Sequence, residues 1–326
     1  MHHYDNLSPD KIISAVESVG IICDARLLAL NSYENRVYQV GVEGGEPLIA
    51  KFYRDERWSD QQILEEHQFS IDLAKAEISV VAPYEYQENT LFKHESFRFA
   101  LFARMGGYSP ELENENSLKV LGRTLGRIHS VGSAGKFDVR PALCFKNEIK
   151  DSCGFLLEHF IPDELKNAYE TLIEDLTETC LTIYDSPYRI SSIRIHGDCH
   201  VGNILWRNNV AHFVDFDDCL NAPPIQDLWM FLNGQKTDRE FQLSKLMEGY
   251  TEFCDFDISQ IRLIEVLRTR RVINYAAWLG KRWSDPAFPK SFPWFNTPRS
   301  WEQHILDLRE QAALMDEPPL NWQAMR

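Results

Sequence analysis

The chain has 326 residues, of which 44% are hydrophobic and 25% are charged, and its formal net charge is −15. These values are typical of a globular protein that is long enough for two lobes, each with its own core. The acidic balance, without a block of Lys and Arg, argues against nucleic-acid binding but leaves an anionic substrate open.

The cysteines and the N-terminus indicate where the protein works. The seven Cys residues contain no CxxC pair, which favours free thiols in a reducing compartment. The first residues show no basic segment followed by an apolar one, and no apolar run is long enough to cross a bilayer. We therefore expect a cytoplasmic protein without membrane contact, and we expect it to be a monomer.

The N-terminal third of the chain predicts a small sheet with helices. Ser8 followed by Pro9 is typical of a helix start, and Gly20 of the end that follows. One helix is expected over residues 61–76, from its apolar spacing. Segments rich in β-forming residues, joined by short polar loops, predict an antiparallel meander over 27–30, 36–42, 48–53, 89–94 and 97–103.

Beyond Gly106 and Gly107 the pattern becomes helical. Gly122 and Gly126 lie one turn apart in a predicted helix and favour close helix packing. Further helices are expected over 165–184, 239–254 and 258–283, and the Pro-rich tail predicts ordered loop and short helices. We expect an α+β protein with a strand-rich lobe over 1–104 and a helical lobe over 105–326.

A polar turn between two apolar segments carries most of the chemically active groups. Asn208 and Asn209 suit the positive-φ positions of a two-residue hairpin turn. Its strands are expected over 203–207 and 210–216. Asn203 and Asp215 then face each other at the open end, beside the loop that carries Asp198. Two carboxylates and an amide oxygen at one place suit a hard cation with a general base nearby.

The spacing of these groups matches the needs of phosphoryl transfer. The motif runs through His196, Asp198, His200, Asn203, Asp215 and Asp217. The reaction needs a base for the attacking hydroxyl and cations that neutralise the phosphates. The step of five residues from Asp198 to Asn203 equals that between the base and a metal ligand in the protein-kinase catalytic loop, and Asp215 takes the place of the second metal ligand.

Stretches along nearly the whole chain resemble the aminoglycoside-phosphotransferase and choline-kinase-like branch of the protein-kinase-like fold. They are residues 30–39, 51–54, 62–69, 196–207, 226–230 and 285–290. The resemblance implies a bilobal kinase-like fold and transfer of phosphate from ATP to a hydroxyl with Mg²⁺. It favours a protein Ser or Thr as the acceptor. A small alcohol such as an amino alcohol, sugar or aminoglycoside is the alternative, and a metal-dependent phosphohydrolase is a further one.

The same resemblance assigns roles residue by residue. It implies Asp198 as the base and Asn203 and Asp215 as Mg²⁺ ligands, with Asp215 also catalytic. Lys51, on a predicted strand, matches the kinase lysine that contacts nucleotide phosphates. Its partner on the next helix is Glu65 or Glu66, and we favour Glu66 because Phe69 and Leu73 follow it at helical spacing.

The loop of residues 31–35 takes the place of the glycine-rich loop of protein kinases, although it lacks that glycine pattern. Its backbone N–H groups and the Ser32 hydroxyl suit a phosphate, and Asn35 belongs to the same candidate nucleotide site. A plain hairpin turn is the alternative. Residues 102–105 are expected to bind adenine through their backbone.

Other side chains near the motif allow more than one interpretation. His196 and His200 suit either a structural role or zinc, and Cys199 and Cys219 suit either redox control or buried packing. Asp217 and Asp218 indicate a second cation site or a solvated turn, and Asp227 indicates a loop organiser. A basic group on one predicted helix suits an anionic substrate or a salt-bridged surface; its members are Arg262, Arg268, Arg270, Arg271, Lys281 and Arg282.

The segment between Asp215 and Asp227 is short. Its eleven residues include no Ser, Thr or Tyr. A phosphorylated activation loop of the kind that switches many protein kinases has no acceptor there. We therefore expect the substrate platform to be built from the helical lobe.

Overall fold

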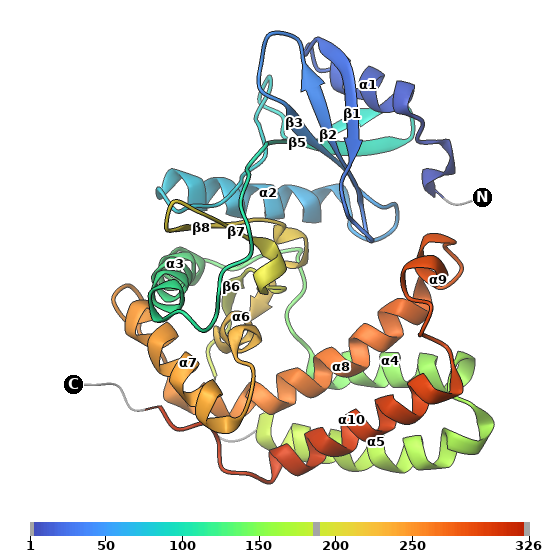
Figure 1. Ribbon diagram of the computed structural model, residues 1–326, viewed down its shortest axis with the longest axis vertical. Helices are drawn as coiled ribbons and strands as arrows, with labels where there is room; N and C mark the ends of the chain where they lie inside the picture. Colours follow the sequence, from blue (N-terminus) through green and yellow to red (C-terminus); the bar gives the residue numbers. More distant parts are fainter. Residues whose placement is uncertain (1–2, 185–189, 323–326) are drawn as a thin grey trace.

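The structure, a computed structural model, describes residues 3–184 and 190–322 and has a sheet-containing part above a helical part (Figure 1). The predicted α+β class is confirmed. One sheet has five strands in the order β1-β2-β3-β5-β4, and each neighbouring pair is antiparallel. Its strands are β1 (Cys23–Ala29), β2 (Arg36–Val42), β3 (Leu48–Phe52), β4 (Phe92–His94) and β5 (Phe97–Ala103).

The sheet departs from the predicted meander at β4. This strand lies at the edge, so that β3 pairs with β5, the strand that follows β4 in sequence. The reason is the long excursion through α2 (Asp60–Lys75), which allows the chain to return beyond the position next to β3. Central β3, which carries Lys51, is therefore hydrogen-bonded on both sides.

Two helices border the sheet. In α1 (Pro9–Glu17), Ser8 accepts a hydrogen bond from the Lys11 backbone and Pro9 occupies the first turn, as predicted. Its buried Ile12 and Val16 belong to the same core cluster as the sheet residues. In Figure 1, α2 runs between the sheet and the helical part, so its two sides face different lobes.

The helical part is built largely around α3, α7 and α8. Gly122 and Gly126 of α3 lie against α7, where an added Cβ would collide with backbone oxygens of that helix, so the predicted close packing is confirmed. The helices are α3 (Glu115–Ser133), α4 (Phe145–His159), α5 (Asp163–Tyr184), α6 (Ile225–Leu228), α7 (Lys236–Tyr250), α8 (Ile264–Lys281), α9 (Ala287–Ser291) and α10 (Pro298–Met315).

Three predictions about helices need correction. The tail is not limited to short helices, because α10 has 18 residues. Thr297 caps α10 and Pro298 occupies its first turn, where proline is tolerated, so this proline begins a helix instead of preventing one. The α4 helix was not predicted. Residues 258–263 form a 3-10 helix before α8, so the predicted single helix over 258–283 has two parts.

The predicted hairpin is present within the helical part. It consists of β7 (Ile204–Arg207) and β8 (Val210–Phe213), and its turn residues Asn208 and Asn209 have φ values of 52° and 59°. The second strand is shorter than predicted, because residues 216–218 form a 3-10 turn. A second small ladder, β6 (Ile193–Ile195) with β9 (Leu220–Ala222), lies next to the hairpin in sequence.

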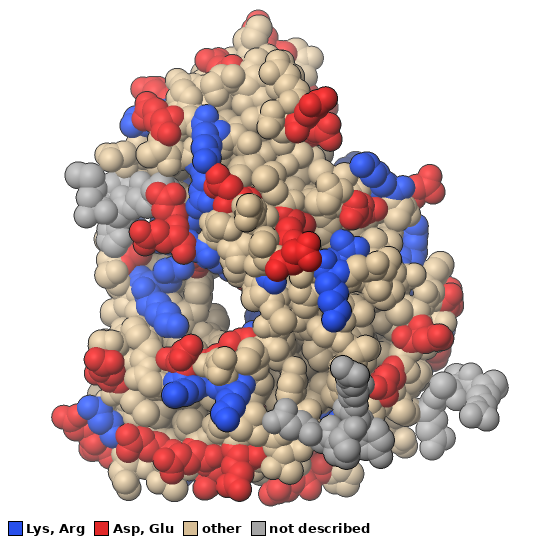
Figure 2. Space-filling view, turned by 180° about the vertical axis from the view of Figure 1, so that it is seen from behind, with Lys and Arg blue, Asp and Glu red and all other residues tan. Residues whose placement is uncertain are grey.

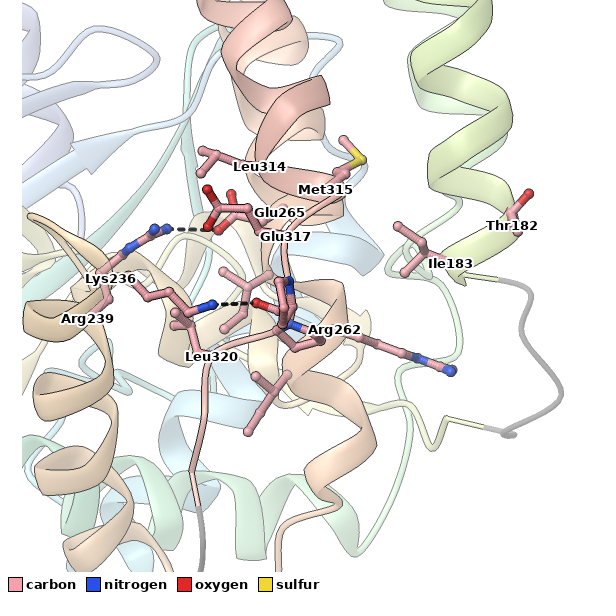
Figure 3. A pocket seen from close by; sticks show the side chains of 14 residues that line it. Thr182, Ile183, Lys236, Arg239, Arg262, Glu265, Leu314, Met315, Glu317 and Leu320 are labelled. Carbon is pink, nitrogen blue, oxygen red and sulfur yellow. Dashed lines mark hydrogen bonds and ion pairs between the residues drawn. The ribbon is translucent and has the colours of Figure 1, made fainter.

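A cavity of about 270 Å³ lies in the helical part, between the start of α7, the start of α8 and the segment after α10 (Figure 3). Its polar groups largely bind each other: Arg239 pairs with Glu265 at 2.9 Å, and Lys236 donates to the Pro318 carbonyl at 2.8 Å. None of its lining residues belongs to the hairpin or its loops. Over the described residues, no helix has the length and apolar character needed to cross a membrane.

Candidate active site

One buried carboxylate, that of Asp227, fixes the backbone of the loop that carries Asp198. Asp227 accepts hydrogen bonds from the backbone N–H groups of His196 and Gly197, each at 2.8 Å, and its Oδ2 lies 3.0 Å from His129 Nε2. Gly197 has a φ of +90°, which an L-residue rarely adopts. Asp227 is thus a loop organiser, as predicted, and His129 is its partner from α3.

The two histidines of the motif have different environments. His196 is fully buried, and its Nε2 lies 2.9 Å from the Val214 carbonyl, which joins the loop to the hairpin. His200 accepts a hydrogen bond from the Gly202 backbone through Nδ1 and directs Nε2 towards Asp198 at 3.4 Å. Among the described residues, no group of three or more His, Cys, Asp and Glu is placed to hold a metal, so the structure gives the zinc interpretation no support.

Asp198 lies at the edge of the site with two basic neighbours. Its Oδ1 is 2.7 Å from Arg271 Nη1, and its Oδ2 faces His200. Burial by itself raises the pKa of Asp198, but the His200 hydrogen bond and the Arg271 charge outweigh burial, so the pKa lies below its usual value. Asp198 is therefore ionised at neutral pH and able to accept a proton.

Asn203 and Asp215 meet at the open end of the hairpin, as predicted. The Val214 N–H donates to the Asn203 carbonyl at 3.0 Å, and Asp215 follows with a φ of +61°. The amide nitrogen of Asn203 donates to the Asp198 backbone carbonyl at 2.9 Å. This hydrogen bond directs the amide oxygen of Asn203 away from that carbonyl. One amide oxygen and one half-exposed carboxylate are the hard oxygen donors that Mg²⁺ prefers, so these residues fit such an ion.

Lys51 joins the sheet to the hairpin. Its Nζ lies 2.9 Å from Asp215, 3.1 Å from Asp217 and 3.5 Å from Glu66. The Lys51 side chain is only 8% exposed. Burial alone lowers the pKa of Lys51, but the charges of Asp215, Asp217 and Glu66 raise it well above its ordinary value. The lysine is thus fixed as a cation among carboxylates from two parts of the chain.

The two neighbouring glutamates of α2 face different partners. Glu66 is buried against Lys51, and burial raises its pKa to about 7. Glu65 instead accepts three backbone N–H groups of residues 138–140, at 2.7, 3.0 and 2.7 Å. The partner of Lys51 is therefore Glu66, the residue favoured from the sequence, while Glu65 ties α2 to the helical part.

Comparison with known proteins identifies the family of this site. Residues 26–264 match the phosphotransferase enzyme family. The chain belongs to this family. It is 43% identical to stress response kinase A of Escherichia coli K12 over 319 residues, 97% of this chain and 96% of that protein. It is 41% identical to the serine/threonine protein kinase RdoA of Salmonella typhimurium over 322 residues, with the same shares.

Solved structures show that this phosphotransferase has a widespread fold. An amicoumacin kinase aligns with a TM-score of 0.74 at 18% identity, over 98% of this chain and 97% of that one. An aminopropanol kinase aligns with a TM-score of 0.69 at 15% identity, over 94% and 96%. The predicted kinase-like fold and the resemblance to phosphotransferases, and in particular to stress response kinase A, are confirmed.

The loop of residues 31–35 in this phosphotransferase is not a plain turn, because it docks on the helical part. Glu34 accepts hydrogen bonds from Trp278 at 2.8 Å and from Arg282 at 2.5 Å, both on or next to α8. The Tyr33 ring lies 5.0 Å from that of Phe292. Figure 1 shows the ends of β1 and β2 reaching down towards α9.

The two candidate nucleotide-binding residues of this loop are already hydrogen-bonded to protein. Ser32 donates to the Asn35 carbonyl at 3.0 Å. The Asn35 amide donates to Asp217 at 3.2 Å and accepts the Arg54 backbone N–H at 3.1 Å. Asn35 therefore supports the carboxylate cluster from within. The backbone N–H groups of the loop are left for a phosphate, whereas Ser32 has to release the Asn35 carbonyl before its hydroxyl can donate to one.

Sequence reasoning missed Arg57 and Arg140, which lie in loops outside any motif. Arg57 pairs with Asp217 and, at 2.6 Å, with Asp218. Arg140 donates to the Cys219 carbonyl at 2.9 Å. Asp217 is buried, and although burial raises the pKa of its carboxyl, the nearby Lys51 and Arg57 charges hold that pKa below its usual range. Asp217 is thus an ion-pair centre, so the interpretation as a solvated turn fails for it.

The basic group on α8 is mostly a salt-bridged surface. Arg268 pairs with Glu265 at 3.4 Å, and Arg270 donates to Glu148 at 2.7 Å. The exception is Arg271, whose carboxylate partner is Asp198 of the site itself. No sequence signal singled out Arg271 from its neighbours.

Cys199 and Cys219 are fully buried beside the site. Burial raises the pKa of both thiols, which disfavours the reactive thiolate. The structure therefore favours packing over redox control for these two residues.

Proposed function

We propose that this phosphotransferase moves the γ-phosphate of ATP, bound with Mg²⁺, to a hydroxyl of a protein serine or threonine. The observation that carries the proposal is the contact of Lys51 with Asp215 at 2.9 Å, because it joins the proposed phosphate-binding lysine to the proposed metal ligand that follows the hairpin, and the loop before the same hairpin carries Asp198. The protein acceptor is supported by the name of the Salmonella relative, a serine/threonine protein kinase.

The nucleotide side of the site is proposed to consist of Lys51, held by Glu66, together with the loop of residues 31–35. We propose that the backbone N–H groups of that loop face the phosphates, and that Ser32 joins them by exchanging its hydrogen bond to the Asn35 carbonyl for one to a phosphate oxygen. Asn35 supports the site through its hydrogen bond to Asp217. Asn203 and Asp215 hold Mg²⁺, which neutralises phosphate charge during transfer. The amicoumacin kinase, solved with AMP-PNP and Ca²⁺, supports a nucleotide and a divalent ion at this fold.

Asp198 is proposed to act as the base. Its carboxylate accepts the proton of the acceptor hydroxyl while the hydroxyl oxygen bonds to the γ-phosphorus. The bond between that phosphorus and the bridging oxygen breaks, and ADP leaves with the electron pair. Because the pKa of Asp198 is lowered, the carboxylate is in the ionised form that this step requires.

The division into lobes follows from these roles. We propose residues 1–104 as the nucleotide-binding lobe and residues 105–326 as the lobe that carries the base, the metal ligands and the substrate platform. We also propose a monomer and, because the described cysteines form no disulfide, a cytoplasmic location. Size-exclusion chromatography with light scattering tests the monomer.

Transfer from γ-labelled ATP tests the function. The protein is incubated with Mg²⁺ and a general protein substrate, and in parallel with amino alcohols, sugars and an aminoglycoside. The proposal expects label on serine or threonine of the protein, and none in a parallel reaction with Asp198→Ala. Labelling of a small alcohol but no protein would replace the acceptor, and phosphate release without any acceptor would replace the reaction.

A further inference from the structure

Arg271 has an unusual position among the cations of α8. Its Nη1 lies 2.7 Å from Asp198 and 3.7 Å from the sulfur of Met230. Across the described chain, no other hydrogen bond or ion pair of this guanidinium is found, so Nε and Nη2 have no hydrogen-bond partner there. The side chain is 42% exposed. A second pair of donors is thus presented to solvent beside the proposed base.

The neighbours of Arg271 have their charges satisfied elsewhere. Arg270 binds Glu148 of α4, and Arg282 binds Glu34 of the loop between β1 and β2. Both contacts hold parts of the protein together. Arg271 instead contacts Asp198, the proposed base that accepts the proton of the acceptor hydroxyl. The charge of Arg271 therefore acts on any substrate group that lies next to that hydroxyl.

We propose, building on the proposed phosphotransfer at Asp198, that Arg271 binds an anionic group next to the acceptor hydroxyl and selects a serine or threonine followed or preceded by an acidic residue. The guanidinium offers two parallel donors through Nε and Nη2, the geometry that matches a carboxylate. Nη1 stays on Asp198 and keeps the base oriented. A cationic acceptor such as an amino alcohol meets an unfavourable charge at the same place.

The surface beyond Arg271 suits an extended segment of a protein substrate. Tyr275 lies one turn further along α8, is 42% exposed, and stacks on Trp278 with ring centroids 5.7 Å apart. Residues at this spacing share one side of a helix. From Arg271 to Trp278 the helix rises about 10 Å, which is the length of about three residues of extended chain.

The distribution of charge bears on which kind of segment can bind. Figure 2 shows an opening between the two parts of the molecule, and both basic and acidic side chains lie around it. The bottom of the same face is mostly Asp and Glu. In a chain with a net charge of −15, most of the surface repels an acidic segment, so its attraction to the site has to come from a local cation such as Arg271.

Peptides that differ at one position test the inference. Three peptides carry the same serine with Asp, Asn or Lys beside it, and kcat/KM is measured for each, together with the KM for ATP. We expect the wild-type protein to prefer Asp over Lys by about tenfold or more, the range of a hydrogen bond to a charged group. Arg271→Gln should remove the preference, and Arg271→Glu should reverse it.

Arg123→Gln is the matched control. Arg123 is 45% exposed and also pairs with a carboxylate, Glu252 at 2.8 Å, at the junction of α3 with the end of α7. The control variant should keep the wild-type preference. Circular dichroism and thermal unfolding establish that each variant is folded before its rates are compared.

Each other outcome has a defined meaning. Equal rates with the three peptides, or a preference that persists in Arg271→Gln, would overturn the inference. A rise in the KM for ATP that is the same with all peptides would make Arg271 a phosphate ligand instead. If the wild-type protein labels small alcohols but no peptide, the protein-kinase proposal fails, and the inference is decided by comparing a hydroxy acid with an amino alcohol of equal length.

Discussion

The two sides of the site differ in how firmly their charges are held. On the nucleotide side, Lys51 is 8% exposed and contacts three carboxylates, and Arg57 pairs with two of the neighbouring aspartates. On the acceptor side, Asp198 is 29% exposed, and its basic partners Arg271 and His200 are also partly open to solvent.

This difference indicates which side of the site is already arranged before a ligand binds. A buried lysine among carboxylates needs little rearrangement to receive phosphates, because its desolvation is already compensated by its partners. A partly exposed arginine retains donors for a second partner. We therefore infer that the proposed nucleotide side is fixed by the fold, and that the proposed acceptor side is adjustable and suited to selecting the substrate.

After the proposed base Asp198, the largest effect is expected from changing Asp215, the proposed metal ligand that contacts Lys51. Asp215→Asn should lower the transfer rate by about 10²–10³-fold, the usual cost of losing a preorganised electrostatic group. It should also weaken Mg²⁺ dependence, measured as the Mg²⁺ concentration at half-maximal rate. Normal Mg²⁺ dependence with a normal rate would show that Asp215 is not a ligand.

The two neighbouring glutamates of α2 allow an effect on the transfer rate to be measured separately from an effect on stability. At a pH above about 7, where Glu66 is ionised in the folded protein, Glu66→Gln should lower transfer by about tenfold, since Lys51 loses a charged partner. Glu65→Gln should leave transfer by the folded protein unchanged and lower the free energy of unfolding by about 1–2 kcal/mol, because three backbone N–H groups lose their charged acceptor. The reverse pattern, measured by rates and urea unfolding, would contradict the assignment.

The buried Glu66 also predicts a pH dependence of stability. Burial raises its pKa from 4.5 in the unfolded chain to about 7 in the folded protein. The folded state therefore keeps a proton that the unfolded chain has lost, so this group's contribution to the free energy of unfolding falls as the pH rises from about 4.5 to about 7. Urea unfolding of the ligand-free protein should show that slope, and Glu66→Gln should reduce it; an unchanged slope would refute the prediction.

The smallest effect is expected where the β1–β2 loop docks on the helical part. Glu34→Gln should lower the free energy of unfolding by about 1 kcal/mol and raise the KM for ATP, because the loop loses the charge that binds Arg282. Glu46→Gln, at an exposed position of the β2–β3 turn, is the control and should change neither quantity. Equal effects of the two substitutions would show that the docking is unimportant.

Local chemistry explains what the sequence predicted well. A two-residue hairpin turn requires positive φ values, which Asn208 and Asn209 tolerate, so the hairpin and its register follow from two residues. That register brings Asn203 next to Asp215 without any long-range information. Lys51 was likewise recognisable, because it lies on a strand of β-forming residues and the family resemblance assigns a phosphate-contacting lysine to that strand.

The contacts that escaped prediction join residues far apart in the chain. Arg271 reaches Asp198 across 73 positions, and Glu34 reaches Arg282 across 248. Both arginines belong to a helix with several similar cations, and only the packing of α8 decides which one faces the site. The α10 helix was missed for a local reason, since Pro298 was weighed as a helix breaker although it occupies the first turn.

The most direct test of the central claim separates binding from chemistry at Asp198. Mg²⁺-ATP affinity by calorimetry and transfer rate by labelled ATP are measured for the wild-type protein and for Asp198→Asn, which preserves shape but removes the base. We predict unchanged affinity with a loss of about 10²–10⁴-fold in rate. An undiminished transfer rate would contradict the account.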